Sequence, residues 1–127
     1  MLPVFKLEPF QKIYAVEGFM EEFDKTVSET KPEGRYHSWL RRKLFILDAK
    51  SYRALSDRDF EPLEDCDPKL YAIRYQKSPK NPRVIYAYVT DGNVYLLHTF
   101  QEGSKKSGSD YRAGIKTAQS RLKQIIR

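Results

Sequence analysis

Two runs of β-forming residues with a tight turn between them are the strongest local signal in the chain. Residues 83–89 and 94–100 consist mostly of apolar and aromatic residues, and Thr90-Asp91-Gly92-Asn93 separates them. An Asp-Gly pair between two such runs is typical of a two-residue hairpin turn. The sequence therefore predicts an antiparallel hairpin, and any fold of this chain must include the sheet that such a hairpin needs.

The position of the turn also predicts how the two strands pair. With Asp91-Gly92 at the tip, the cross-strand pairs are Val89 with Val94, Ala87 with Leu96, Ile85 with His98 and Arg83 with Phe100. Because side chains alternate along a strand, all of these residues share one face of the hairpin. A slip of one residue would move one strand's set to the other face.

Shorter patterns predict two strands and two helices in the first half of the chain. Residues 4–7 and 12–15 could each form a short strand. Apolar residues at helical spacing predict a helix over 16–27. Thr30 and Glu33 have the spacing of a capping box, with Thr30 as the N-cap of a second helix. The apolar side of that helix is formed by Tyr36, Trp39, Leu40, Leu44, Leu47 and Leu55.

The second half adds strands before the hairpin and a helix after it. Residues 60–63 form at best an edge strand, because a proline in this run cannot donate to a ladder, and residues 70–75 read as a strand. After a Gly- and Ser-rich loop, a last helix begins near Ser107 or Ser109. Its apolar stripe consists of Tyr111, Ile115, Ala118, Leu122 and Ile125. Helices followed by hairpin-linked strands predict the α+β class, as one domain of 127 residues.

Positive charge is concentrated in the second half of the chain. Residues 1–68 carry 11 Lys/Arg and 14 Asp/Glu, a net −3, whereas residues 69–127 carry 12 Lys/Arg and three acids, a net +9. The two values sum to the +6 of the whole chain. Such a division favours a polyanionic partner, nucleic acid, for the second half. A solvated basic face is the alternative.

Cysteine, histidine and apolar content argue against several classes of function. Cys66 stands in the acidic run Glu64-Asp65-Cys66-Asp67, which disfavours the thiolate that a nucleophile needs. One cysteine and two histidines lie too far apart for a zinc pattern, so we expect neither metal nor cofactor. The chain shows no signal-peptide pattern and no run near the ~18 apolar residues of a membrane span. We therefore expect a cytoplasmic protein without a membrane partner.

Several segments of the second half resemble the RelE/ParE toxin superfamily, and within it the phage-derived HigB-like branch. The segments that carry the resemblance are 70–75, 81–86, 94–100, the loop with Lys105-Lys106, and the last helix with Ala118, Arg121 and Leu122. The resemblance covers residues 35–127 well and the first third loosely. It implies a RelE-like fold, in which an N-terminal strand and two helices pack on a small, mostly antiparallel sheet that a C-terminal helix follows.

The resemblance also implies a function. Proteins of this kind are toxins of type II toxin–antitoxin systems, and many are endoribonucleases, or mRNA interferases, that cleave mRNA on the ribosome without a metal ion. The implied partners are mRNA, the ribosome and a cognate antitoxin, often a helix-turn-helix protein. Two departures stand out. Ala72-Ile73-Arg74 lacks the acidic residue that many relatives have before this arginine, so an ion pair there is missing or replaced. Glu102 weakens the basic loop.

Five residues are candidates for catalysis: Arg83, Lys105, Lys106, Tyr111 and His98. RNA cleavage by its own 2′-hydroxyl needs a proton acceptor, a stabiliser of phosphorane charge and a proton donor to the leaving oxygen. The arginine and tyrosine match family positions, the lysine pair lies in the family's basic loop, and His98 shares a hairpin face with Arg83. Each has a structural interpretation as well: a surface arginine, a solvated lysine pair, a core tyrosine and a structural histidine.

The candidates for RNA binding are the generic phosphate-binding residues Arg74, Lys77, Lys80 and Arg112. His37 lies in the helix opposite the expected site, so we interpret it as structural and not as catalytic. Two other functions stay open: a ParE-like toxin that acts on DNA gyrase without nuclease activity, and an inactive RelE-fold binding module. The set of Arg83, Tyr111 and the two loop lysines favours the nuclease, because ParE-like members generally lack such a set.

Overall fold

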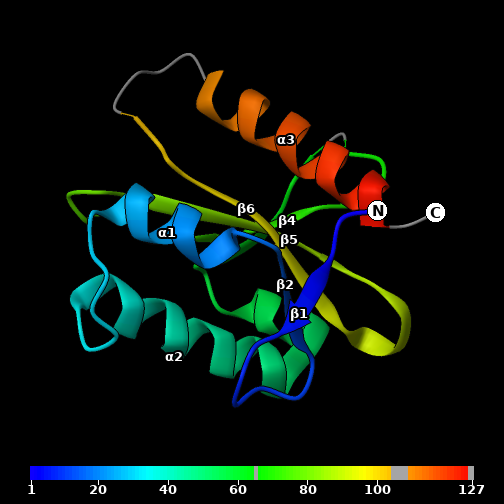
Figure 1. Cartoon of the computed structure of the whole chain (residues 1–127), viewed down its shortest axis with the longest axis horizontal. Helices are drawn as coiled ribbons and strands as arrows, with labels where there is room; N and C mark the ends of the chain where they lie inside the picture. Colours follow the sequence, from blue (N-terminus) through cyan, green and yellow to red (C-terminus); the bar gives the residue numbers. More distant parts are fainter. Residues whose placement is uncertain (65, 104–108, 126–127) are drawn as a thin grey trace.

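The computed structural model describes residues 1–64, 66–103 and 109–125, and shows one mixed β-sheet with helices on both faces. The strands are β1 (Val4–Lys6), β2 (Ile13–Val16), β3 (Phe60–Pro62), β4 (Tyr71–Arg74), β5 (Pro82–Tyr88) and β6 (Val94–Gln101). The helices are α1 (Phe19–Val27), α2 (Arg35–Lys50) and α3 (Ser109–Ile125), with 3₁₀ turns η1 (Ser51–Ser56) and η2 (Thr90–Gly92). Helix α3 lies on one face of the sheet, and α1 and α2 lie on the other (Figure 1).

The sheet has the strand order β1-β2-β6-β5-β4-β3. All neighbouring strands are antiparallel except β2 and β6, which run parallel over the short stretch 13–15 with 94–96. The predicted α+β class is therefore confirmed, and the sheet is mostly antiparallel as expected. The proline-containing strand β3 forms an edge of the sheet, as its missing N–H requires.

The β5–β6 hairpin follows the predicted register in one half only. Arg83 pairs with Phe100 and Ile85 with His98, as expected, but the register then shifts and Tyr86 pairs with Leu96. The shift is a β-bulge that gives β6 one extra residue. The predicted two-residue tip is wrong as well, because the Val89 N–H donates to the carbonyl of Asn93 at 2.8 Å and leaves a three-residue loop.

The second helix begins differently from the prediction. Helix α2 starts at Arg35, so the proposed capping box at Thr30 is wrong. Instead the Glu29 carboxylate, from the preceding loop, accepts the backbone N–H groups of Tyr36 at 3.0 Å and His37 at 2.8 Å. A carboxylate is well placed here, because the first N–H groups of a helix have no partner within it and carry partial positive charge.

Two helix boundaries also differ, each for a local reason. Val16 belongs to β2, so α1 begins at Phe19 and not at residue 16. Helix α2 ends at Lys50, because Ser51 has a left-handed φ of 52° that an α-helix cannot accommodate. Leu55 therefore lies in η1 and not in the helix.

Strand β5 is the centre of the core. Residues 82–87 are all buried, because α3 covers one face of this strand and the other helices cover the opposite face. The α3 stripe contributes Ala118 and Leu122, which are both buried. Gly114 lets α3 approach the sheet closely, since a Cβ at this position would lie 2.6 Å from Cε1 of Phe100. No helix among the described residues is long and apolar enough to cross a membrane.

We predict that Gly114→Ala lowers the free energy of unfolding by about 1 kcal/mol. Overpacking a core costs about 1–3 kcal/mol, and the gain of about 1 kcal/mol in helix propensity offsets part of this cost. Urea denaturation measures the loss. In a Phe100→Leu background the ring atom is absent, so the same substitution should cost clearly less. Equal losses in both backgrounds would contradict the close contact.

Candidate functional site

Strand pairing brings two of the predicted arginines together at one end of the sheet. Arg83, near the start of β5, is directly opposite Arg74, the last residue of β4. The first turns of α3 place Tyr111 beside them, with its ring centre 5.9 Å from the Arg83 guanidinium carbon. Glu61 of β3 and Glu102, just after β6, complete the group. We call these five residues the arginine cluster.

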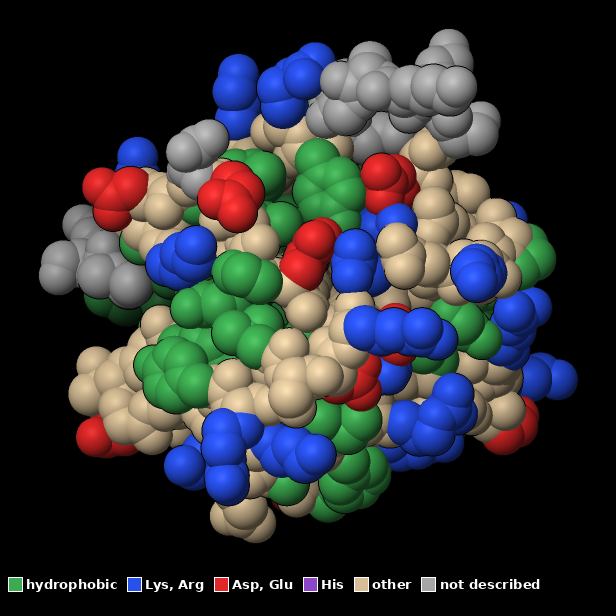
Figure 2. Space-filling model, turned by 180° about the vertical axis from the view of Figure 1, so that it is seen from behind, with side chains coloured by type: hydrophobic (Ala, Val, Ile, Leu, Met, Phe, Trp, Pro, Cys, Tyr) green, Lys and Arg blue, Asp and Glu red, His purple; other side chains and the backbone are tan. Residues whose placement is uncertain are grey.

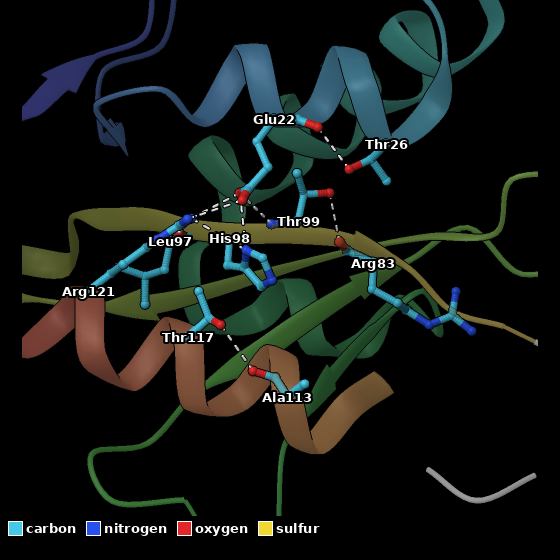
Figure 3. A network of polar contacts seen from close by, with 9 residues as sticks. All are labelled: Glu22, Thr26, Arg83, Leu97, His98, Thr99, Ala113, Thr117 and Arg121. Carbon is cyan, nitrogen blue, oxygen red and sulfur yellow. Dashed lines mark hydrogen bonds and ion pairs between the residues drawn. The ribbon is translucent and has the colours of Figure 1, made fainter. Parts of the chain in front are cut away.

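The Arg83 side chain is almost fully buried, which corrects the alternative of a surface arginine at the strand's start. Only 4% of the residue is exposed. Its Nη2 forms an ion pair with Glu102 Oε1 at 2.5 Å, and its Nη1 donates to Asn81 Oδ1 at 2.7 Å. The guanidinium points along the sheet toward the end of β6 and away from the polar network at Glu22 (Figure 3). In this structure the guanidinium is therefore already paired with a carboxylate.

The ion pair is held in place by the backbone at the open end of the hairpin. The Glu102 N–H donates to the Asn81 carbonyl at 3.1 Å, and the Asn81 side-chain amide donates to the Glu102 carbonyl at 3.3 Å. Asn81 has a left-handed φ of 47°, a conformation that asparagine adopts more readily than most residues. These contacts fix Glu102 and Asn81 on either side of the Arg83 guanidinium.

Arg74 and Tyr111 share the second carboxylate of the cluster. Arg74 Nη1 lies 3.4 Å from Glu61 Oε1, and its Nη2 donates to the Arg58 carbonyl at 2.6 Å. Arg74 thus pairs with a carboxylate of the neighbouring strand β3. The Tyr111 hydroxyl donates to Glu61 Oε2 at 3.0 Å. Burial and the nearby Glu61 raise the Tyr111 pKa, although Arg83 lowers it, so this hydroxyl is protonated at neutral pH.

A second polar network lies on the edge of β6 that β2 leaves open. Strand β2 pairs only with residues 94–96, so the Leu97 carbonyl and the Thr99 N–H have no strand partner. Arg121 of α3 donates to the Leu97 carbonyl at 2.8 Å, and Glu22 of α1 accepts the Thr99 N–H at 3.2 Å. Glu22 and Arg121 also form a bidentate pair with distances of 2.9 and 3.1 Å (Figure 3).

His98 is fixed by this network. Its Nδ1 lies 3.1 Å from Glu22 Oε1 and 3.4 Å from Arg121 Nη1. Burial raises the Glu22 pKa, but the hydrogen bonds from His98 and Arg121 outweigh it and hold the pKa at about 2. An ionised carboxylate can only accept, so the closer contact places a hydrogen on Nδ1. Nε2 is then the nitrogen that can take up or release a proton.

The remaining candidates are spread more widely. Lys77 and Lys80 lie in the β4–β5 loop, Lys77 exposed and Lys80 half-buried, and Arg112 lies exposed on α3. Lys105 and Lys106 lie outside the described residues. His37 contacts Asp24 at 2.7 Å and Glu29 at 2.8 Å between α1 and α2. The structure thus brings Arg74, Arg83 and Tyr111 together, and places His98 two residues from Phe100, the strand partner of Arg83.

Comparison with protein families gives one match. Residues 40–123, more than half of the chain, match the family described as phage-derived Gp49-like proteins (DUF891). The chain belongs to the Gp49-like family. This family is part of the RelE/ParE-like toxin superfamily, so the match agrees with the resemblance at the level of the superfamily and is consistent with a toxin. No curated protein and no solved structure matches the chain.

The carboxylates of this Gp49-like protein were not predicted as part of its site. Glu22 and Glu61 come from the acidic first half of the chain, yet they contact Arg121 and Arg74 of the basic half. On the face seen from behind, Asp and Glu side chains accordingly lie among the Lys and Arg side chains (Figure 2). The sequence offered a hint of two of these carboxylates, because Glu102 follows the end of a predicted strand and Glu61 lies in the predicted edge strand. No feature of the sequence pointed to Glu22.

We predict that Glu22→Gln lowers the free energy of unfolding by about 2 kcal/mol at pH 7. A pKa lowered from 4.5 to about 2 corresponds to about 3 kcal/mol, and partial exposure of the carboxylate reduces this. Folding lowers this pKa, so the wild-type advantage is complete above about pH 4.5 and is lost as the pH falls toward 2. Urea denaturation across this range measures the difference.

Glu21→Gln is the matched control, since it removes the same charge from an exposed position one residue away. Its effect should stay within about 0.5 kcal/mol. A difference between wild type and Glu22→Gln that does not change with pH would contradict the assigned network.

Proposed function

We propose that this Gp49-like protein is the toxin of a type II toxin–antitoxin system, on the HigB-like branch, and that it is an mRNA endonuclease. The observation that carries the proposal is the arginine cluster, which joins two arginines and a protonated tyrosine inside the family-matched region. The +9 charge of residues 69–127 supports a polyanionic substrate. mRNA on the ribosome, and a helix-turn-helix antitoxin, are the partners that this proposal implies.

The proposed reaction is attack of the RNA 2′-hydroxyl on the adjacent phosphate, which needs no metal ion. The O2′–P bond forms and the P–O5′ bond breaks, leaving a 2′,3′-cyclic phosphate and a free 5′-hydroxyl. The proton from O2′ goes to a base, and a proton from an acid goes to the leaving O5′. Tyr111, which stays protonated at neutral pH, suits the acid. His98, whose Nε2 can take up a proton, suits the base.

Arg83 suits the stabilisation of phosphorane charge, because the planar guanidinium matches two phosphate oxygens as it matches a carboxylate. Glu102 occupies part of it in the free protein. A substrate phosphate would therefore have to displace this carboxylate. Arg74, Lys77, Lys80 and Arg112 would hold neighbouring phosphates, and Lys105 and Lys106 would add to them or assist proton transfer.

One observation favours a second candidate function. The guanidinium of Arg83 is closed by Glu102 and Asn81, as expected of an inactive binding module of the same fold. The two functions differ in what the pair does when RNA is present. In an enzyme the pair opens for a phosphate, whereas in an inactive module it is permanent.

We predict that induced expression without an antitoxin cleaves cellular mRNA, and that Arg83→Gln reduces cleavage by about 100- to 1,000-fold. Loss of one donor to a developing oxyanion typically has this effect. Arg83→Lys should recover little of the cleavage, because an ammonium has the charge but not the paired, planar N–H donors of a guanidinium. Mapping of new mRNA 5′ ends after induction measures cleavage. Altered DNA supercoiling with intact mRNA would support the gyrase-directed alternative instead.

Arg83 is buried, so its loss also destabilises the fold, and a matched control is needed. Lys43 of α2 is a similarly buried cation, 14% exposed, paired with Asp59 at 2.6 Å and Asp57 at 3.3 Å. Lys43→Gln should destabilise the protein without changing cleavage by the folded fraction. Equal loss of cleavage in both variants, after correction for folded protein, would show that Arg83 is structural.

We predict that Glu102→Gln binds RNA about tenfold more tightly than the wild type. A charge-assisted hydrogen bond contributes about 1.5 kcal/mol or more, and the phosphate no longer has to displace it. The same change should lower stability, because a buried guanidinium loses its counter-charge. Anisotropy of a labelled RNA and urea denaturation should thus move in opposite directions. Glu33→Gln, an equal change of charge at an exposed position, controls for net charge.

A further inference from the structure

An exposed tyrosine stack lies at the opposite end of β5 from the arginine cluster. Tyr52 of η1 is 55% exposed, and its ring lies over that of Tyr88 at a tilt of 34°, with centres 4.0 Å apart. Tyr88, the last residue of β5, also contacts Tyr71 edge-on at 5.0 Å. Tyr52 therefore packs one side of its ring on the protein and presents much of the remainder to water.

The position of Tyr52 is fixed by the backbone before it. Ser51 has φ 52° and ψ −124°, an uncommon conformation for a residue with a side chain. The Tyr88 hydroxyl donates to the Ser51 carbonyl at 2.8 Å and holds this residue in place. Such a conformation persists only where the surrounding contacts determine it, and it directs the chain so that Tyr52 meets Tyr88.

Basic residues flank Tyr52 in the sequence. Lys50 and Arg53 are both exposed beside Tyr52 in sequence, and they line one shallow hollow with Ser56. A Cβ at Gly92 would lie 3.7 Å from both Lys12 Nζ and Ser51 Oγ, so the Lys12 ammonium and the Ser51 hydroxyl both lie beside the η2 turn. The surface thus combines an exposed aromatic ring with basic residues close to it in the chain.

We propose that Tyr52, supported by Tyr88, is a stacking platform for a base of single-stranded RNA, with Lys12, Lys50 and Arg53 binding the adjacent phosphates. An aromatic face accepts any base that is not already stacked, and the cations supply affinity that does not depend on sequence. The bases of a duplex cannot reach such a ring. An acidic peptide would use the cations but would leave the aromatic face unused.

This platform is separate from the arginine cluster. Arg83 and Tyr88 are five residues apart on one strand, about 17 Å at roughly 3.3 Å per residue, and alternation directs them to opposite faces of the sheet. The platform therefore concerns how RNA is held, and it does not rest on the proposed cleavage. It can be tested whether or not the protein is a nuclease.

The test measures binding of a fluorescently labelled 2′-O-methyl oligouridine, which cannot be cut by 2′-hydroxyl attack. We expect Tyr52→Ala to weaken binding by about 5- to 150-fold, the range for loss of one base–aromatic stack. Tyr52→Phe should bind like the wild type, since the ring remains. Tyr52→Leu should bind like Tyr52→Ala, although it retains apolar area, and it serves as the test if the alanine variant does not fold.

Phe45 offers a matched control on α2. It is 50% exposed and packs edge-on against Phe10 at 4.8 Å, so Phe45→Ala removes an equally exposed ring from another surface. It should leave RNA binding unchanged. The proposal is overturned by wild-type binding of both Tyr52→Ala and Tyr52→Leu, or by equal weakening in Phe45→Ala. Equal weakening of duplex-RNA binding by Tyr52→Ala would also overturn it. So would a Tyr52→Ala variant that no longer binds a protein partner but still binds RNA like the wild type.

Arg83→Gln separates this proposal from the proposed function. If the platform binds RNA, Tyr52→Ala should weaken oligouridine binding by the same factor in the Arg83→Gln background, because the two sites share no side chain. A protein that never cleaves RNA but shows this dependence would retain the platform and lose the nuclease proposal. A protein that cleaves RNA but binds oligouridine equally well with and without the Tyr52 ring would retain the nuclease proposal and lose the platform.

Discussion

The open edge of β6 is the constraint on which the arrangement of this protein depends. Strand β2 covers only the first part of β6, and the backbone groups of Leu97 and Thr99 need partners because unpaired buried amide groups are costly. Glu22 and Arg121 supply them, and by pairing with each other they join α1 to α3 across the sheet edge. The ion pair between the two helices thus satisfies backbone groups that a neighbouring strand would otherwise pair.

The same pair explains why a histidine on this strand is so well ordered. Glu22 is held ionised between Arg121 and His98, and it orients the imidazole through Nδ1. If His98 acts as a base, the contacts that complete the sheet also set its tautomer. If it does not, these contacts still account for its burial. These contacts are needed to complete the sheet, so their use in orienting a catalytic histidine would require no additional contacts.

Sequence patterns predicted what local chemistry controls and missed what tertiary contacts control. The Asp-Gly turn between two β-forming runs predicted the hairpin and its register at Arg83 and Ile85, but no residue type marks the bulge that shifts the register beyond them. The spacing of Thr30 and Glu33 suggested a cap, yet Glu29 reaches the helix because the loop folds back. Arg83 became a candidate because it starts a strand and matches the strand arginine of the superfamily, whereas its pairing with Glu102 and Asn81 depends on the folded hairpin that brings them together.

Strand β5 connects the two surfaces that this protein is proposed to use for RNA. Its interior is buried on both faces, so it is a rigid spacer between Arg83 at one end and Tyr88 at the other. A base held at Tyr52 would be far from the scissile phosphate, and its binding energy would be the same in the ground state and the transition state. Such uniform binding lowers KM without raising kcat. The platform would therefore determine how much RNA is bound, and the arginine cluster would determine how fast bound RNA is cut.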